Sequence, residues 1–309
     1  MKHIYLVFLL VTSIGFAQLT PPASLQTYYT DVDFSKTGSD LYDDLATTTI
    51  AKHTTFLTYS QRHQFLYNAD EDSSNESNVL LMYSGESRSK TEYVSGSNPN
   101  STQTFNTEHV YPRSLLDIGI SEADLHLLRS CDTNINSSRG NNPFTDGSGT
   151  PNQAYFSTGS SFFPGWEWRG DVARIIMYVN LRYNEPFSDV GSLSLFLQWN
   201  AEDQVSDFEI NRNEVISGAQ GNRNPFIDNP YLATVIWGGP TATNRWAPLS
   251  NNVFSFNDVQ IYPNPNKNNK LFISTTSDLD VVIYSVLGKL VLTNTINSNT
   301  ITLRSSLRH

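Results

Sequence analysis

The sequence predicts an α+β fold for most of the chain, followed by a small β-rich segment at the C-terminal end. In the first 246 residues, several stretches place apolar residues at helical spacing, and shorter apolar runs lie between groups of Gly, Pro, Asn and Ser. After residue 256 the pattern changes to alternating apolar residues separated by turn dipeptides, which is typical of strands. With 309 residues and a hydrophobic content of 38%, the chain can form one substantial core and an appendage.

The N-terminus has the pattern of a signal peptide. Lys2 precedes an apolar run over residues 4–16, and small residues at Gly15 and Ala17 suit cleavage directly after Ala17. We therefore predict a signal peptide at residues 1–17. The apolar run is too short for a stable membrane span, and no later segment approaches spanning length. We expect an exported protein, extracellular or periplasmic, and a monomer.

The elements expected in the following domain, residues 18–246, are helices and short strands. A helix is expected at 41–50, where Gly38-Ser39-Asp40 provides a start signal. Strands are expected at 78–83, before Pro112, and at 123–128, and helices at 134–138, 171–183, 193–199 and 205–216. The helices are expected to support a small irregular sheet.

The helix expected at 171–183 carries an apolar stripe with helical spacing. The stripe consists of Val172, Ile175, Ile176, Val179 and Tyr183. It is most simply a face that packs into the core. Arg174 lies off this stripe, so we expect that its side chain can reach a cleft.

Charge and cysteine content exclude two classes of protein. The net charge of −10 argues against a protein that holds duplex DNA through a broad basic face. The single cysteine, Cys131, excludes an intramolecular disulfide framework. Between His109 and Tyr183 every cation is an arginine, the residue whose planar fork matches phosphate oxygens. The alternative is that these arginines form salt bridges with Asp124, Asp132 or Asp171.

The stretch from Thr107 to Phe144 concentrates the residue types that hydrolyse phosphodiesters with one cation. Glu108 supplies a carboxylate and Asn136 an amide oxygen, the ligand types that Mg²⁺ prefers. His109 is a base whose ordinary pKa lies near working pH, so it can activate a water molecule. A nearby arginine can hold a phosphate. The sequence therefore predicts a metal-dependent phosphodiesterase.

The neighbouring positions of Glu108 and His109 make a structural demand. Adjacent residues on a regular strand point to opposite faces. For both side chains to serve one site, we expect the backbone to twist or bulge at this point, shortly before Pro112.

Five segments resemble the endonuclease I family of secreted bacterial nucleases. They are E-H-V-Y-P at 108–112, D-L-H-L-L at 124–128, I-N-S-S-R-G-N-N-P-F at 135–144, R-G-D-V-A-R at 169–174 and Q-G-N-R-N-P-F at 220–226. The resemblance covers roughly residues 25–237 and several ordered motifs. It implies a ββα-metal (His-Me finger) core within a mainly helical domain. It further implies a nonspecific nuclease that acts on DNA, and often RNA, with Mg²⁺; Mn²⁺ or Ca²⁺ are other candidates.

The resemblance also assigns roles to individual residues. It implies that His109 is the general base and that Glu108 and Asn136 hold the metal. The arginine that stabilises the transition state is predicted among Arg174, Arg139 and Arg113, in that order. Arg113 and Asn141 are further candidates for substrate binding, although Arg139 and Asn141 can instead brace their loop. His126 can orient the site, with a hydrogen-bonded structural histidine as the alternative.

Two departures from the family pattern bear on these roles. Leu127 follows D-L-H where relatives of the group usually carry Asn or His, which predicts different hydrogen bonding around the site. The segment between Pro112 and Ala123 is shorter than in disulfide-bonded members, where a phosphate-binding arginine can sit.

The C-terminal segment resembles the sorting domain of type IX secretion. Residues 247–256 are predicted to be a linker, and residues 257–309 a small β-sandwich with the Y-P-N-P signature at Tyr262–Pro265. A Gly-Tyr turn and a basic final strand are missing, so we expect a partial sorting domain. The type IX secretion machinery is the implied partner.

Other functions remain open at this point. Trp166, Trp168, Tyr155 and Phe162 could form an aromatic platform of a surface adhesin or glycan-binding module. The net charge of −10 also argues against a degenerate nuclease that only binds DNA. A zinc hydrolase is disfavoured because no H-E-x-x-H or similar spacing occurs. The acidic loop at 70–76 lacks the spacing of a calcium loop and is expected to be a solvated turn.

Overall fold

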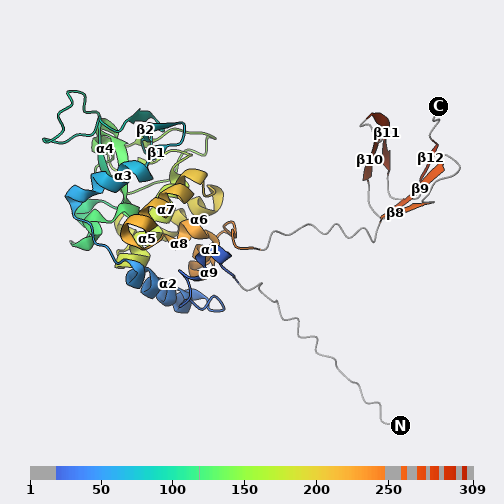
Figure 1. Cartoon of the computed structure of the whole chain (residues 1–309), viewed down its shortest axis with the longest axis horizontal. Coiled ribbons are helices and arrows are strands. Elements are labelled where there is room, and N and C mark those ends of the chain that lie inside the picture. Colours follow the sequence, from blue (N-terminus) through green and yellow to red (C-terminus); the bar gives the residue numbers. More distant parts are fainter. Residues whose placement is uncertain are drawn as a thin grey trace, which may run out of the picture. The chain divides into compact units, whose positions relative to one another are not determined.

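The structure, a computed structural model, describes residues 19–117, 119–247, 259–262, 270–275, 279–284, 289–296 and 301–304 (Figure 1). The chain divides into two units, residues 1–247 and residues 248–309. The predicted signal peptide, nearly all of the predicted linker and Pro263–Pro265 of the Y-P-N-P signature lie outside the described residues.

The first unit is an α+β domain in which helices predominate, as the sequence predicts. Its helices are α1 (Ala23–Gln26), α2 (Gly38–Lys52), α3 (His63–Ala69), α4 (Thr133–Arg139), α5 (Arg169–Tyr183), α6 (Leu193–Glu202), α7 (Asp207–Gln220), α8 (Pro225–Asp228) and α9 (Tyr231–Trp237). Short 3-10 turns are η1 (Tyr59–Arg62), η2 (Arg113–Leu115), η3 (Ile120–Ala123), η4 (Leu125–Leu127) and η5 (Phe187–Asp189). The predicted helices at 41–50, 171–183, 193–199 and 205–216 all exist.

Helix α5 lies at the centre of the first unit (Figure 1). It packs against α2, α6 and α8, and the predicted apolar stripe is in the core. The opposite side of the helix is buried as well, including Asp171, Arg174 and Tyr178. Burial all round is the pattern of a central helix, whereas a surface helix has one apolar face. Arg174 therefore faces the interior, and the expectation that it reaches a cleft is wrong.

The strands of the first unit form three small antiparallel sheets among the described residues. The sheets are β1 (Glu71–Asp72), β2 (Asn75–Leu80) and β3 (Ser87–Ser89); β4 (Phe105–His109) with β5 (Leu128–Asp132); and β6 (Phe156–Ser157) with β7 (Phe162–Phe163). The acidic loop at 70–76 forms β1, the turn after it and the start of β2. Its first residue, Asp70, is buried and accepts a hydrogen bond from the Ser130 amide.

The β4–β5 pair leads directly into α4 and positions the predicted site. The expected strand at 123–128 is wrong, because this stretch forms the turns η3 and η4 and the strand begins only at Leu128. Asp124 explains the difference, since its side chain caps η4 by accepting the His126 amide and so favours a turn. The strand pairing places Glu108 opposite Arg129 and His109 opposite Leu128.

The second unit consists of short antiparallel strands, as its alternating pattern predicts. They are β8 (Val259–Tyr262), β9 (Lys270–Thr275), β10 (Leu279–Tyr284), β11 (Leu290–Ile296) and β12 (Ile301–Arg304). The order β12-β9-β8 forms one sheet and β10-β11 another. The β-sandwich remains a prediction.

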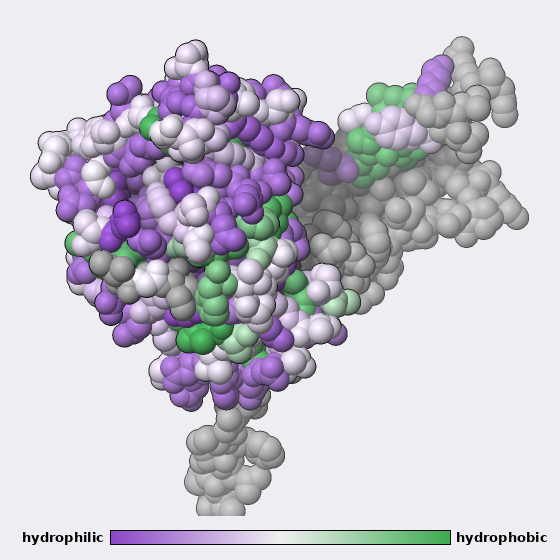
Figure 2. Space-filling view, turned by 60° about the vertical axis from the view of Figure 1, so that its left-hand side comes forward, coloured by the Kyte–Doolittle hydropathy of each residue, from purple (hydrophilic) through white to green (hydrophobic). Residues whose placement is uncertain are grey.

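The surface of the first unit is mainly polar on the face that Figure 2 shows, with small hydrophobic patches. Its large exposed apolar side chains are Ile50, Phe56 and Val94 in the described part of the chain. Among the described residues, no helix is both long enough and apolar enough to cross a membrane.

Candidate active site

A pocket of about 380 Å³ lies at the end of strand β4. Its walls come from the end of β4, from Pro112 and the start of η2, and from α4 with the two residues that follow it. The lining residues are Thr107, Glu108, His109, Pro112, Arg113, Ser114, Asn136, Gly140 and Asn141. The pocket therefore gathers five of the eight residues predicted to form the site.

The two adjacent residues Glu108 and His109 reach this pocket without a bulge. The pairing of β4 with β5 runs in continuous register from Phe105 to His109. Of the expected twist or bulge, the bulge is therefore absent from this strand pair. Pairing ends at His109, before Pro112, so the pocket covers the end of the strand, where both side chains are accessible from one space.

The His109 imidazole is fixed in one tautomer. Its Nε2 lies 3.0 Å from the main-chain carbonyl oxygen of Glu122. A carbonyl oxygen only accepts, so Nε2 carries the proton and Nδ1 keeps a free lone pair. Burial is the main cause that lowers the pKa of His109 to about 4, and the cations of Arg113 and Arg62 act in the same direction. The ring is therefore neutral at neutral pH, as a general base must be.

Glu108 is a buried carboxylate with two fixed neighbours. The Tyr83 hydroxyl donates to Oε1 at 2.9 Å, and Nε of Arg139 lies 3.4 Å from the same oxygen. Neither contact uses Oε2. Burial raises the pKa of Glu108, while Arg139 and Tyr83 oppose this shift. Tyr83 adopts a φ of 73°, an unusual backbone conformation for a bulky residue, next to this carboxylate.

Asn136 is presented by the first turns of α4. The Asp132 carboxylate caps this helix by accepting the amides of Asn134 and Ile135. Nδ2 of Asn136 donates to Asn106 Oδ1 at 2.7 Å and to the Thr107 carbonyl at 3.2 Å. Because both amide hydrogens are used, Oδ1 is the end of the side chain left for another group.

These donor atoms fit a hard divalent cation. A buried carboxylate and an amide oxygen line the same pocket, and both are oxygen ligands of the kind that Mg²⁺ and Ca²⁺ take. Within the described ranges, no group of three or more His, Cys, Asp and Glu side chains could hold a metal. The pocket thus suits a cation that keeps several waters, and not a zinc ion with a full set of protein ligands.

The predicted arginines are placed differently from one another. Arg113 lines the pocket, is exposed, and pairs with Glu122 at 2.8 Å. Arg139 is fully buried beside the pocket, where its guanidinium donates to the carbonyls of Val110 and Gly140. Its contacts favour the alternative that it braces this loop. Asn141 is exposed at the pocket wall.

Two other predicted residues lie away from the pocket. Arg174 is fully buried and forms a two-pronged ion pair with Glu209, with N···O distances of 2.6 and 2.8 Å. Arg174 was the first candidate for the arginine that stabilises the transition state. Because it is buried in the core, this prediction is wrong. His126 is also buried, and its Nε2 donates to the Asn222 carbonyl at 3.1 Å. It is a hydrogen-bonded structural histidine, the alternative that the sequence left open.

The aromatic platform of the alternative function is not present as an exposed surface. Phe162 is fully buried and Trp168 is 6% exposed. The partly exposed Trp166 is covered by the Arg169 guanidinium, 3.7 Å from the ring centroid. The structure therefore gives no support to a glycan-binding face at these residues.

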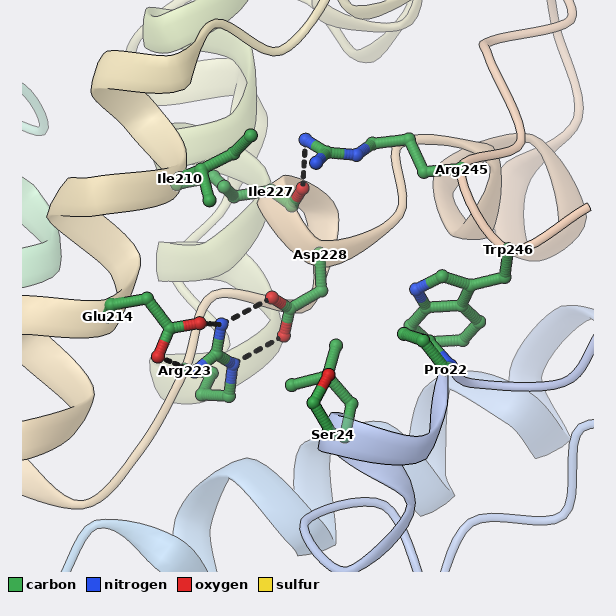
Figure 3. A pocket seen from close by; sticks show the side chains of 10 residues that line it. Pro22, Ser24, Ile210, Glu214, Arg223, Ile227, Asp228, Arg245 and Trp246 are labelled. Atoms are coloured by element: carbon green, nitrogen blue, oxygen red, sulfur yellow. Dashed lines mark hydrogen bonds and ion pairs between the residues drawn. The ribbon is translucent and has the colours of Figure 1, made fainter.

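A second, smaller pocket lies between the N-terminal segment and the end of the first unit (Figure 3). Arg223 bridges Asp228 and Glu214 along one wall, which occupies both carboxylates. Arg245 lies on the other side of this pocket, and its guanidinium donates to the Ile227 carbonyl at 3.5 Å. This cluster ties the segment after α7 to that helix.

Sequence reasoning missed several residues at or beside the pocket. Tyr83 ends an apolar run, and this pattern indicated a buried strand but no contact with the site. Tyr59 stacks on the His109 imidazole, with 5.5 Å between ring centroids and 23° between planes. Arg62 bonds to Thr107 from η1. These contacts join parts of the chain that are distant in sequence, so no local pattern could indicate them.

Two family models and several known proteins match this chain. A model of the family described as Endonuclease I matches residues 37–231, and a model of the secretion system C-terminal sorting domain matches residues 260–308. An extracellular ribonuclease of Bacillus amyloliquefaciens is 37% identical over 243 residues, covering 72% of this chain and 81% of the relative. An extracellular ribonuclease of Bacillus subtilis is 38% identical over 247 residues, with coverage of 72% and 82%.

A shorter match concerns a second kind of nuclease. An extracellular deoxyribonuclease of Aeromonas hydrophila is 32% identical over 114 residues, which cover 35% of this chain and 50% of the relative. The family match spans more than half of the chain, and it contains every residue that lines the site pocket. The chain belongs to the endonuclease I family and is a nuclease, with a C-terminal sorting domain of type IX secretion.

Proposed function

We propose that the protein is a secreted, sequence-nonspecific nuclease that hydrolyses phosphodiester bonds of RNA and DNA with a single Mg²⁺ and His109 as general base. The observation that carries the proposal is the pocket at the end of β4. It combines a neutral histidine of fixed tautomer with a buried carboxylate and a free amide oxygen. The order β4, β5, α4 supports a ββα-metal core.

In the proposed step, Nδ1 of His109 accepts a proton from a water molecule. The water oxygen forms a bond to phosphorus as the bond to the leaving alkoxide breaks, and the alkoxide takes a proton from solvent. The Glu122 carbonyl holds the Nε2 proton, and Tyr59 packs against the ring. Both contacts restrict rotation of the imidazole, which keeps Nδ1 directed at one place.

Glu108 and Asn136 would hold the metal, through Oε2 and Oδ1. When bound, a cation of this kind polarises the phosphoryl oxygen and stabilises the leaving alkoxide. Tyr83 and Arg139 orient the Glu108 carboxylate from behind, so they act as positioning residues. Mg²⁺ is the proposed ion, and Mn²⁺ or Ca²⁺ can be compared with it directly.

Arg113 and Asn141 both line this pocket and are proposed to contact the substrate. The substrate range follows from the relatives, two of which are ribonucleases and one a deoxyribonuclease by name. We further propose that the protein acts as a monomer, that residues 1–17 direct export, and that the C-terminal segment engages the type IX secretion machinery.

Degradation assays test the proposal. Purified protein would be incubated with plasmid DNA and with total RNA, in Mg²⁺, Mn²⁺, Ca²⁺ or EDTA. We expect degradation of both substrates with Mg²⁺ and none with EDTA. The His109→Ala variant is expected to lose about 10²- to 10⁴-fold in rate.

The matched control is His63→Gln. His63 is a half-buried histidine that does not line the pocket, so this variant should keep its activity. Intact RNA and DNA in all three metals would contradict the proposed nuclease activity. Full activity of His109→Ala would leave the nuclease in place but contradict the assigned base.

A further inference from the structure

Arg62 occupies a fixed position beside the active-site pocket. It ends η1, and its Nε donates to Oγ1 of Thr107 at 2.9 Å, a residue that lines the pocket. Its guanidinium also donates to the Tyr59 carbonyl and lies over the Tyr59 ring, 3.7 Å from the centroid. Tyr59 in turn stacks on His109. One cation is therefore tied to two groups at the site.

Arg62 differs from the other arginines around the pocket by having no acidic partner. Arg113 pairs with Glu122 at 2.8 Å, and Arg139 lies 3.4 Å from the Glu108 carboxylate. For Arg62, no carboxylate of the described chain lies within 4 Å of the guanidinium. Its recorded hydrogen bonds use Nε and Nη1, which leaves Nη2 for a ligand.

A half-buried cation without a counter-charge costs stability unless a ligand supplies that charge. The second guanidinium near the same ring, that of Arg113, lies 5.6 Å from the Tyr59 centroid, but Glu122 balances its charge. The three contacts of Arg62 also hold the side chain in place before any ligand binds. Its fork is therefore preorganised for an anion with several oxygens.

We propose that Arg62, held by Tyr59 and Thr107, binds a backbone phosphate of the substrate next to the phosphate that is cleaved. The neighbouring phosphate is assigned because Arg62 bonds to Thr107, which lines the pocket, but does not itself line the pocket that contains His109 and Glu108. The inference rests on the proposed nuclease function and adds a subsite to it. Tyr59 is a positioning residue that supports both Arg62 and the base.

Substrates with one or several phosphates distinguish binding of a neighbouring phosphate from an effect on the scissile phosphate itself. Kinetics of the wild type and Arg62→Ala would be measured on a short oligonucleotide and on a dinucleoside monophosphate, which has only the scissile phosphate. We expect Arg62→Ala to raise KM for the oligonucleotide by roughly 10- to 100-fold, the usual effect of losing one charged hydrogen bond. For the dinucleoside monophosphate, kcat/KM should stay within about twofold of the wild type.

Salt dependence and binding give two independent readouts. The slope of log(kcat/KM) against log[salt] on the oligonucleotide should become less negative by about one. In the His109→Ala background, in which cleavage is about 10²- to 10⁴-fold slower, Arg62→Ala should weaken oligonucleotide binding by a similar factor. Arg62→Lys keeps the charge but not the fork, so it should restore the salt slope and only part of the affinity.

Arg245→Ala serves as the matched control, because Arg245 is an exposed arginine outside the site pocket. It should leave all these values unchanged. Equal loss by Arg62→Ala on both substrates, or no loss on either, would overturn the inference. A wild type that is inactive on every substrate would instead overturn the proposed function, so the two failures are distinguishable.

Discussion

At the scale of single residues, burial disfavours the charged forms of Glu108 and His109, the two adjacent residues at the end of β4. It raises the pKa of the Glu108 carboxyl and lowers the pKa of the His109 imidazole to about 4. For His109 the effect is useful, since a neutral imidazole can accept a proton. For Glu108 it is a cost that a bound cation would remove. Burial therefore favours the neutral form that His109 needs as a base, and it leaves the Glu108 carboxylate in need of a counter-charge.

Tyr83 offers a test of this arrangement at the residue scale. Tyr83→Phe removes the hydroxyl that donates to Glu108 and keeps the buried ring. We expect Mg²⁺ affinity to fall by roughly 10- to 100-fold, because Glu108 loses the group that orients it. The measurement is activity as a function of Mg²⁺ concentration.

At saturating Mg²⁺, Tyr83→Phe should recover most of its kcat. A variant with unchanged Mg²⁺ dependence would show that the hydroxyl does not orient a metal ligand. The melting temperature of the variant checks that the strained backbone at Tyr83 is retained.

At the scale of elements, the site depends on how α4 begins. Asp132 ends β5 and caps α4, so one residue ends the strand and starts the helix that carries Asn136. Its carboxylate also pairs with Arg88 at 2.7 Å. The sequence predicted the helix within a few residues but not its cap, because Asn and Ser nearby are equally good capping residues.

Asp132→Ala is expected to destabilise the first unit by about 1–2 kcal/mol through loss of the cap. Asp132→Asn keeps an acceptor oxygen for the cap and loses only the charge, so it should cost less. Urea unfolding followed by tryptophan fluorescence measures both, since all five tryptophans lie in the first unit. Equal losses in the two variants would assign the effect to the Arg88 ion pair.

The ion pair between α5 and α7 gives a second prediction at this scale. Arg174→Met leaves the Glu209 carboxylate buried and uncompensated, so we expect a loss of roughly 3–5 kcal/mol in unfolding free energy. Specific activity per folded molecule should not change, because Arg174 is remote from the pocket.

The double variant Arg174→Met/Glu209→Gln should regain part of the stability, since no unpaired charge remains and the amide can still serve the Ser206 capping box. A large loss of kcat in a fully folded Arg174→Met protein would restore this arginine as a catalytic candidate.

At the scale of the whole unit, a buried polar cluster joins η4, α5 and the segment after α7. Asp124 accepts hydrogen bonds from the hydroxyls of Tyr178 and Tyr183, and Gln220 donates to it as well. His126 packs beside Tyr178 and bonds to the Asn222 carbonyl. These hydrogen bonds connect residues 54 to 96 positions apart, so the cluster forms only when the whole unit has folded.

The cluster predicts how stability changes with pH. Burial lowers the pKa of His126 from 6.5 to about 4, against the opposing effect of Asp124 and together with Arg212 and His53. Between these values the unfolded chain binds a proton that the folded chain does not. The contribution of neutral His126 to the free energy of unfolding is therefore complete above pH 6.5. It is lost as pH falls towards 4, and the loss reaches roughly 3 kcal/mol.

Urea unfolding between pH 7.5 and pH 4.5 would show this decline. His126→Gln retains a donor for the Asn222 carbonyl but does not titrate, so its stability should depend less steeply on pH. Parallel curves for the variant and the wild type would contradict the assignment to His126.

The sequence by itself determined the α+β class, most helices, the pocket residues Glu108, His109 and Asn136, and the family. These features follow from local patterns, because helical spacing and motif order are properties of neighbouring residues. The tertiary structure alone decided which arginines face the site. A guanidinium can pair with any acidic group that folding brings to it. Only packing showed that Arg174 meets Glu209, whereas Arg62 bonds to Thr107 and has no acidic partner in the described part of the chain.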